Sequence, residues 1–341
     1  MGLEERVLGR TGLRVRALGL GGLFVSRYGS PDRVAAHRAI CRALELGVNY
    51  IDTAPSYHDS EEALGEALHG VPADAYVLAT KLGGRPTPFD PRDGAALRRS
   101  VEESLRLLRR DYVDVLLIHE PERPGQYDWW SDWARFDGPV NAVVADLQAA
   151  GKVRFSGLGG TTAYELAPIM ATGRYDVVQS AFNYTLLWRE ALWAVFPEAA
   201  RQRMGLIIGS PLEQGALARR YDEAVAHGAR WLSPPRREQL RRLYALLDDL
   251  GLPLPEVALR FVLSHPQVSL TLTGARSIEE VELNVRAAEA GPLPPDVLAR
   301  LQEIADLVPF RPTGEPAVLP FGRPYQGPGH VAAGMKWLEG R

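Results

Sequence analysis

Hydrophobic positions along the chain fall into two kinds of segment that alternate. Short runs rich in β-branched residues or leucine are typical of buried strands, and each is followed by a longer run whose apolar residues recur every three or four positions, as on one face of a helix. This alternation is typical of repeated strand-helix units around a parallel sheet. Eight strands are predicted, at residues 15–20, 49–52, 76–80, 112–118, 153–158, 177–179, 206–208 and 269–273.

The longer amphipathic runs predict eight helices, at residues 31–46, 60–68, 94–108, 140–149, 163–171, 190–203, 236–250 and 278–289. Eight strand-helix units are the repeat number of a (β/α)8 barrel, whereas a doubly wound sheet rarely needs as many. Residues 6–16 form two short alternating runs joined by a turn that contains glycine, which predicts a hairpin able to plug the barrel bottom. We therefore expect one α/β domain over residues 1–308, a (β/α)8 TIM barrel with an N-terminal β-hairpin.

Two further segments are longer than the loops usual in compact domains. Residues 120–138 carry several aromatic rings, among them Trp129 and Trp130, and follow the fourth predicted strand. We expect this segment to overhang the barrel mouth. Residues 309–341 hold too many prolines and glycines for regular structure, but they also carry aromatic residues that a solvated linker usually lacks. We expect this long C-terminal tail to pack on the barrel, disorder being the alternative.

Composition and charge exclude several classes of protein. The chain has 46% hydrophobic and 24% charged residues and a formal net charge of −3, and its charges of both signs are interspersed, so nucleic-acid and anionic-membrane partners are not expected. Cys41 is the single cysteine, which rules out an internal disulfide and fits a reducing, cytoplasmic compartment. No apolar run approaches the ~20 residues that span a bilayer, and the acidic first residues do not resemble a signal peptide.

Several catalytic motifs can be set aside. The glycine-rich stretches at 19–24 and 157–162 resemble the start of a dinucleotide fingerprint, but each lacks the third glycine. The chain has neither a Gly-x-Ser-x-Gly elbow nor a Walker loop, so hydrolase and P-loop interpretations have no anchor. Its seven histidines never occur at metal-ligand spacing, and we expect no metal.

Four polar residues stand at the ends of three successive predicted strands. Asp52 ends the second strand and Tyr57 follows five residues later, Lys81 comes directly after the third strand, and His119 comes directly after the fourth. Because the C-terminal ends of barrel strands meet at one mouth, these four residues, the tetrad, would share a site. Taken singly, Asp52 could cap a helix, Lys81 could be a solvated lysine and Tyr57 could pack at the rim.

The tetrad has a chemical logic. A tyrosine is a poor acid at neutral pH because its pKa is about 10, and a neighbouring ammonium is expected to lower that value. Tyr57 backed by Lys81 and Asp52 would thus be a tunable general acid, and His119 could hydrogen-bond a substrate oxygen beside it. None of the four supplies electrons, so a redox reaction here requires a nicotinamide cofactor.

With these residues in place, the sequence resembles the aldo-keto reductase family, nicotinamide-dependent oxidoreductases built on a (β/α)8 barrel. The resemblance covers most of the chain. The motifs that carry it are LGRTGLRV at 8–15, DTAPSY at 52–57, the lysine Lys81, LLIH at 116–119, GKVR at 151–154, VQ at 178–179, SPL at 210–212 and GARS at 274–277 with Asn284.

The resemblance implies roles for individual residues. It makes the tetrad catalytic, with Tyr57 as proton donor in reduction and base in oxidation, and it implies NADP or NAD as cofactor, NADP slightly favoured. Gln179 would hold the nicotinamide carboxamide. The implied cofactor contacts are Gly22, Leu23, Asp52, Gln179, Ser210, Pro211, Leu212, Gly215, Leu217, Gly274, Arg276, Glu280 and Asn284. The implied substrate contacts are Phe24, Tyr57, His119, Trp129 and Trp130.

Three positions depart from the pattern of the family. Gly159 and Gly160 stand where the family commonly has Ser-Asn, which clamps the carboxamide. Gly209 stands where an aromatic residue often stacks on the nicotinamide, and Glu280 stands where a neutral or basic residue is common. These departures concern how the cofactor is oriented and which cofactor is chosen, and they leave the fold and the tetrad unaffected.

The sequence thus predicts an NAD(P)-dependent oxidoreductase acting on a small-molecule aldehyde, ketone or aldose. Residues 178–188 and the Gly159-Gly160 pair most resemble the aldose 1-dehydrogenase branch of the family. One alternative is a nucleotide-sensing regulatory subunit of the same fold with little turnover. Another is a non-redox barrel enzyme, which would bind no nicotinamide. Assembly into a homo-oligomer is compatible with the sequence.

Overall fold

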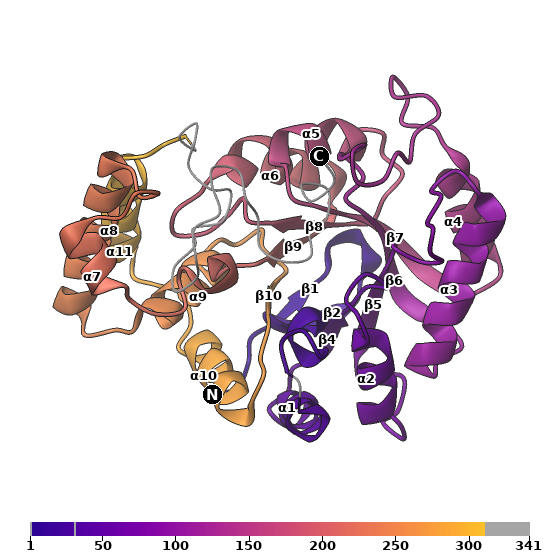
Figure 1. The fold of residues 1–341 in the computed structure, drawn as a ribbon, viewed down its shortest axis with the longest axis horizontal. Helices are drawn as coiled ribbons and strands as arrows, with labels where there is room; N and C mark the ends of the chain where they lie inside the picture. The colour runs from indigo at the N-terminus through magenta and orange to yellow at the C-terminus, as the bar shows by residue number, and fades with distance from the viewer. Residues whose placement is uncertain (1, 31, 311–341) are drawn as a thin grey trace.

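The computed structural model describes residues 2–30 and 32–310, so the predicted packing of the tail lies, beyond its first two residues, outside the described residues. Eight parallel strands close into a barrel in the order β10-β3-β4-β5-β6-β7-β8-β9, which confirms the predicted fold (Figure 1). The barrel strands are β3 (Leu18–Gly21), β4 (Tyr50–Asp52), β5 (Val77–Leu82), β6 (Val113–His119), β7 (Val153–Gly160), β8 (Val177–Ala181), β9 (Gly205–Gly209) and β10 (Leu270–Thr273).

Helices surround the barrel on its outside (Figure 1). Those at the eight predicted places are α1 (Arg33–Glu45), α2 (Ser60–Ala67), α3 (Gly94–Leu108), α4 (Pro139–Ala149), α5 (Ala163–Met170), α6 (Glu190–Gln202), α8 (Pro234–Leu250) and α10 (Ile278–Glu289). Three helices were not predicted: α7 (Asp222–His227), α9 (Leu254–Leu263) and α11 (Pro295–Ala305). Among residues 2–30 and 32–310, no helix is long and apolar enough to span a membrane.

Side chains alternate between the two faces of each barrel strand, because successive residues of a strand point in opposite directions. In β6, Val115 and Leu117 belong to the cluster that fills the barrel interior, whereas Leu116 and Ile118 pack in the core between the barrel and the helices. The same alternation continues to the strand end and turns His119 into the barrel. It also turns Lys81 inward after Ala79, and Gln179 after Val177.

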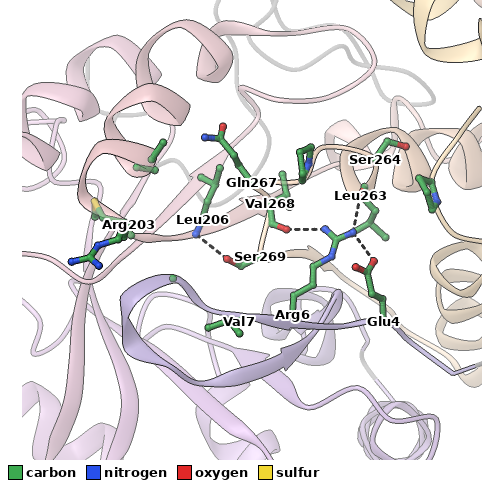
Figure 2. A pocket seen from close by; sticks show the side chains of 16 residues that line it. Glu4, Arg6, Val7, Arg203, Leu206, Leu263, Ser264, Gln267, Val268 and Ser269 are labelled. Atoms are coloured by element: carbon green, nitrogen blue, oxygen red, sulfur yellow. Dashed lines mark hydrogen bonds and ion pairs between the residues drawn. The ribbon is translucent and has the colours of Figure 1, made fainter. Parts of the chain in front are cut away.

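The N-terminal hairpin plugs the bottom of the barrel, as the sequence predicts. Strand β1 (Glu5–Val7) pairs antiparallel with β2 (Arg14–Arg16), and Leu8 and Val15 join the interior cluster without any exposed surface. Figure 2 shows Arg6 reaching from this hairpin to the carbonyl oxygens of Val268 and Leu263, at 2.7 and 2.8 Å. These bonds tie the first strand of the chain to the segment that leads into β10.

The predicted first barrel strand at 15–20 is wrong in its boundaries. The structure divides it at Ala17, because residues 14–16 pair with β1 and only residues from Leu18 onward pair with β4 and β10. At the break, the Ala17 N–H donates to the Glu4 carbonyl and the Ala17 carbonyl accepts from the Thr271 N–H, both at 2.9 Å. One short segment therefore serves both the hairpin and the barrel.

Candidate active site

The tetrad lines one cavity of about 830 Å³ at the C-terminal mouth of the barrel. Its floor is a buried ion pair. Lys81 Nζ lies 2.7 and 2.6 Å from the two carboxylate oxygens of Asp52, and it also donates to the Thr53 carbonyl at 2.9 Å. All three N–H donors of the ammonium therefore have a partner. Bonds at these distances fix the lysine side chain beneath the loop that carries Tyr57.

Tyr57 and His119 complete the tetrad above this ion pair. Lys81 Nζ lies 4.8 Å from the centroid of the Tyr57 ring. The Tyr57 and His119 rings meet edge to face, with centroids 5.8 Å apart and planes at 82°. His119 Nδ1 lies 3.4 Å from Ser56 Oγ, which leaves Nε2 as the nitrogen available to a bound molecule. The structure thus brings together all four residues that the strand ends predict.

The expectation that Lys81 lowers the pKa of Tyr57 is wrong for this structure. Burial raises the pKa of Tyr57 well above its usual value of 10, and the charges of Asp52 and Glu120 raise it further. The physical reason is that Asp52 neutralises Lys81 at hydrogen-bond distance, so the phenol lies beside an ion pair and not a lone cation. Tyr57 is therefore a protonated phenol in the cofactor-free protein.

The other members of the tetrad are shifted by the same burial. Burial lowers the pKa of Lys81 and raises that of Asp52, and the attraction between the two charges opposes both shifts. Burial, aided by the Lys81 charge, holds the pKa of His119 well below 6.5. The imidazole is consequently neutral at physiological pH and can donate one hydrogen bond.

Most of the residues predicted to contact the cofactor line the same cavity. They are Leu23, Asp52, Gln179, Ser210, Pro211, Leu212, Gly215, Gly274, Arg276, Glu280 and Asn284. Gly22 and Leu217 do not line it. A Cβ at Gly22 would lie 2.6 Å from Ser60 Oγ, and Leu217 has no exposed surface, so both belong to the packing behind the wall. For these two residues the cofactor contact stays a prediction.

The wall formed by β8 and β9 fits the amide end of a nicotinamide. Gln179 Oε1 is buried without a hydrogen-bond partner in the described part of the chain, and a carboxamide would offer it an N–H. Gly209 has no side chain and so leaves space beside Gln179. A Cβ at this position would lie 3.2 Å from Ala181 Cβ and 3.7 Å from Gln179 Nε2. The unpaired Gln179 Oε1 and the space beside it at Gly209 together suit a nicotinamide carboxamide.

At the far end of the cavity, Arg276 and Glu280 are bonded to each other at the start of α10. The Arg276 guanidinium donates to Glu280 Oε1 and its backbone N–H donates to Oε2, both at 2.9 Å. Ser277 caps the helix by accepting from the Glu280 N–H. Both charged side chains keep considerable exposed surface, so the pair is accessible and modest in strength.

Aromatic rings line one part of the cavity. Phe24 lines the cavity as predicted, and Tyr28 and His58, which the sequence analysis missed, line it beside Phe24. The Tyr28 and His58 rings stack with centroids 5.8 Å apart, and the Phe24 ring lies 6.4 Å from Tyr28. Tyr28 and His58 lie beyond the strand ends, where no periodicity in the sequence marks them.

Trp129 and Trp130 do not overhang the mouth, and the prediction that they form substrate walls is wrong. Neither side chain has any exposed surface, and neither lines the cavity. The Trp129 indole N–H donates to the His119 carbonyl at 2.9 Å, and the Trp130 N–H donates to the Pro121 carbonyl at 2.8 Å. The long loop folds inward on these two rings because its apolar surface is more stable buried than suspended over solvent.

The polar side of the cavity is formed by Glu120, Gln126 and Thr161, which the sequence analysis also missed. Glu120 had a usable signal, since it directly follows His119 at the end of β6. Nearby, a Cβ at Gly160 would lie 2.6 Å from both carboxylate oxygens of Glu122. Glu122 thus fills the space that a larger residue at position 160 would need. Within residues 2–30 and 32–310, no group of three or more potential ligands could hold a metal ion.

Comparisons with known proteins agree with this geometry. The family model described as "Aldo/keto reductase family" matches residues 17–306. An L-galactose dehydrogenase of Arabidopsis thaliana is 32% identical over 302 residues, which cover 84% of this chain and 88% of that protein. A relative from Schizosaccharomyces pombe, named as a voltage-gated potassium channel beta subunit, is 29% identical and covers 89% of this chain and 94% of its own.

Among solved structures, an aldo-keto reductase from Bacillus halodurans in its holo form superposes with a TM-score of 0.73. It is 27% identical in sequence, and the match covers 91% of this chain and 98% of that one. The family model spans all eight strands of the closed barrel, so the fold and the sequence point to the same family. The chain belongs to the aldo-keto reductase family.

Proposed function

We propose that the protein is an NAD(P)-dependent oxidoreductase of the cytoplasm that interconverts an aldehyde, ketone or aldose with its alcohol or lactone. The observation that carries the proposal is the buried Lys81-Asp52 pair beneath Tyr57, with His119 at its edge, in a cavity large enough for a cofactor and a small substrate. The similarity to an L-galactose dehydrogenase supports an aldose as one substrate class.

Each tetrad residue has a task in this reaction. Tyr57, protonated because it is buried, donates its proton to the carbonyl oxygen during reduction and takes it back during oxidation. Neutral His119 donates a hydrogen bond to the same oxygen and orients it, while the Lys81 ammonium offsets the Asp52 charge, which would otherwise disfavour the phenolate that forms. A nicotinamide cofactor, when bound, supplies or accepts the hydride. Gln179 holds its carboxamide, and NADP is slightly favoured over NAD.

A second candidate is a nucleotide-sensing subunit with little turnover, which the similarity to a channel beta subunit favours. The two functions share the cofactor cavity and differ in kinetics. An enzyme turns over steadily with excess cofactor and substrate, whereas a sensor gives one burst of oxidation followed by slow release. The complete tetrad in a substrate-sized cavity favours the enzyme.

The deciding experiment is a fluorescence titration with NADH and NADPH, followed by steady-state assays with a panel of aldehydes and aldoses. Tyr57→Phe should leave cofactor affinity within a few-fold and lower kcat by the ~10²–10⁴ typical of a lost general acid. Lys81→Met should act similarly, because the Asp52 charge would then disfavour the phenolate with nothing to offset it.

Tyr164→Phe, on the exposed face of α5, is the matched control and should leave both quantities unchanged. Retention of a tenth of the wild-type kcat by Tyr57→Phe would remove the tyrosine from the proposed role. A protein that binds neither nucleotide would be a non-redox barrel.

A further inference from the structure

Glu120 is a buried acid that the tetrad mechanism leaves unused. It follows His119 directly, lines the cavity and keeps only 6% of its surface exposed. Its Oε2 accepts a hydrogen bond from Thr161 Oγ1 at 2.7 Å, and Arg123 Nε lies 3.5 Å from the same oxygen. Oε1 accepts no hydrogen bond from residues 2–30 and 32–310. One oxygen is thus anchored, and the other is left for a molecule in the cavity.

The backbone holds Glu120 in an unusual conformation. Its φ of 48° lies in the left-handed region, which side chains other than glycine, asparagine and aspartate rarely adopt. Its N–H donates to the Gly159 carbonyl at 2.7 Å, which keeps the residue at the point where β6 ends beside β7. Strain of this kind persists only where surrounding contacts maintain it, and it is frequent at functional sites.

Glu120 lies next to the reacting end of the cavity, because it directly follows His119 at the end of β6. Its charge is close enough to raise the pKa of both Tyr57 and Lys81. Gln179, on β8 and paired in register with Gly159, is placed for the carboxamide, and its Oε1 is itself without a partner in the described part of the chain. An acceptor beside His119 is therefore placed to meet the substrate, close to its carbonyl group.

The two faces of the cavity suit a hydroxylated substrate. Glu120, Gln126 and Thr161 give one polar face, while Phe24 and Tyr28 give an aromatic face. A molecule with hydroxyl groups on one edge and C–H groups on the other satisfies both faces at once. An unsubstituted aldehyde would leave the free oxygen of Glu120 without a hydrogen-bond partner.

We propose that Glu120 determines substrate specificity by forming a hydrogen bond, through its free oxygen, with the hydroxyl group on the carbon next to the carbonyl, so that 2-hydroxyaldehydes, aldoses included, are preferred. This inference rests on the proposed function, because it names the substrate class of the same site. Glu122 plays no part in it. Its Oε1 accepts the N–H groups of Thr161 and Thr162, at 2.7 and 3.0 Å, and so holds the loop after β7.

The test compares 2-hydroxypropanal with propanal, two aldehydes that differ by one hydroxyl group. The quantity measured is the ratio of their kcat/KM values. A general loss of activity affects both aldehydes equally and leaves this ratio unchanged, and aldehyde hydration is the same for every variant. Glu120→Ala should lower this ratio about tenfold or more, as expected when a site built to bind a hydroxyl loses its partner. Glu120→Gln keeps an acceptor and should hold the ratio within about threefold of wild type.

Two further variants keep the result decisive. Glu120→Asp withdraws the carboxyl group by one carbon while keeping a buried acid, and it should lower the ratio even where Glu120→Ala does not fold. Glu279→Gln, the same exchange at a residue of α10 outside the cavity lining, is the matched control and should leave the ratio unchanged.

An unchanged ratio in both Glu120→Ala and Glu120→Asp overturns the inference. A weakened NADPH or NADH affinity with an unchanged ratio also overturns it and moves Glu120 to the cofactor. If the wild-type protein reduces neither aldehyde with either nucleotide, the proposed function fails and the inference fails with it. Turnover of propanal separates that case from the failure of the inference alone.

Discussion

Single residues in strained conformations gather around the cavity. Of the residues other than glycine with positive φ, those lining the cavity are His58, Glu120, Phe182, Ser210 and Gln214. Each such conformation costs of order 1 kcal/mol or more. By contrast, Arg109 and Arg203 merely end α3 and α6, where left-handed residues are routine. The strain around the cavity therefore reflects the demands of the site and not of the fold.

Glu120 should make the stability of the protein depend on pH. Burial and the nearby charge of Glu122 raise the pKa of Glu120 from 4.5 to about 8. The folded protein then holds a proton that the unfolded chain has already lost, so the stability contributed by Glu120 is complete below pH 4.5 and is lost as the pH rises towards 8. Glu120→Gln should therefore become relatively more stable with rising pH, by up to about 3 kcal/mol between pH 5 and pH 7.5.

Urea unfolding at pH 5 and pH 7.5 measures this difference. Glu238→Gln is the control, because Arg241 and Arg242 lower the pKa of Glu238 to about 2, so that its charge is the same in both states across this range. An equal difference between Glu120→Gln and wild type at the two pH values would contradict the prediction.

At this scale, the sequence predicts residues whose position follows from strand geometry. The positions of Asp52, Lys81 and His119 follow from parallel strands that end at one mouth, and inward alternation follows from the strand itself. Glu120 was missed because an acid followed by Pro121 and Glu122 resembles a solvated loop. Its burial depends on how distant residues 159–161 fold over it, and no local pattern records that.

Among the elements, the long loop between β6 and α4 shows how composition can mislead. Its aromatic rings suggested an exposed binding wall, yet Trp129 and Trp130 are core residues. Trp129→Ala and Trp130→Ala should each cost about 3–5 kcal/mol of unfolding free energy, because each leaves a large cavity and an unpaired carbonyl.

Chemical denaturation checks this cost. Trp133→Ala in the same loop is the control, since that ring is 38% exposed, and it should cost under about 1 kcal/mol. A normal unfolding midpoint for Trp129→Ala combined with a raised KM would restore the original interpretation of the loop.

The start of α10 should set the choice of cofactor. Arg276 suits a 2′-phosphate, but Glu280 is bonded to it and would repel that phosphate while accepting a ribose hydroxyl. We expect both cofactors to be used, with NADP preferred by no more than ~1.4 kcal/mol, a tenfold ratio. Glu280→Gln should shift the balance towards NADP, measured as the ratio of kcat/KM for NADPH and NADH.

Glu279→Gln, one residue earlier and outside the cavity lining, should leave this ratio unchanged. Preference for NADPH above a hundredfold in the wild-type protein would contradict the prediction. So would the absence of any shift in Glu280→Gln.

Elements were predictable wherever their periodicity was clear. Helix α3 begins and ends at the predicted residues because Asp93 caps it and its apolar stripe is strong. Helix α9 was missed although Glu256 and Arg260 give it a polar face one turn apart, because it follows α8 directly and does not fit one helix per strand. The division of residues 15–20 between hairpin and barrel depends on pairing with segments far away in the chain.

For the whole molecule, the barrel separates stability from chemistry. Its mouth carries the tetrad and its bottom carries the hairpin plug, where Arg6 bridges to Val268 and Leu263 beside a second cavity of about 680 Å³ (Figure 2). Such a plug should contribute to the stability of the fold and not to the reaction, because the interior cluster lies between the plug and the active site. Changes at the two ends should therefore have separable effects.

Arg6→Met tests this separation. It keeps the apolar stem of the side chain but removes the guanidinium that donates to the carbonyls of Val268 and Leu263. A hydrogen bond from a charged donor is worth roughly 1.5–3 kcal/mol. We expect a clear loss of unfolding free energy, with kcat and cofactor affinity unchanged. Arg14→Met is the matched control on the same hairpin, since that side chain is 71% exposed and its ion pair with Glu5 is a surface pair, so it should cost under about 1 kcal/mol. If Arg6→Met instead lowered kcat at unchanged stability, the two ends of the barrel would be coupled, and the hairpin would belong to the catalytic machinery.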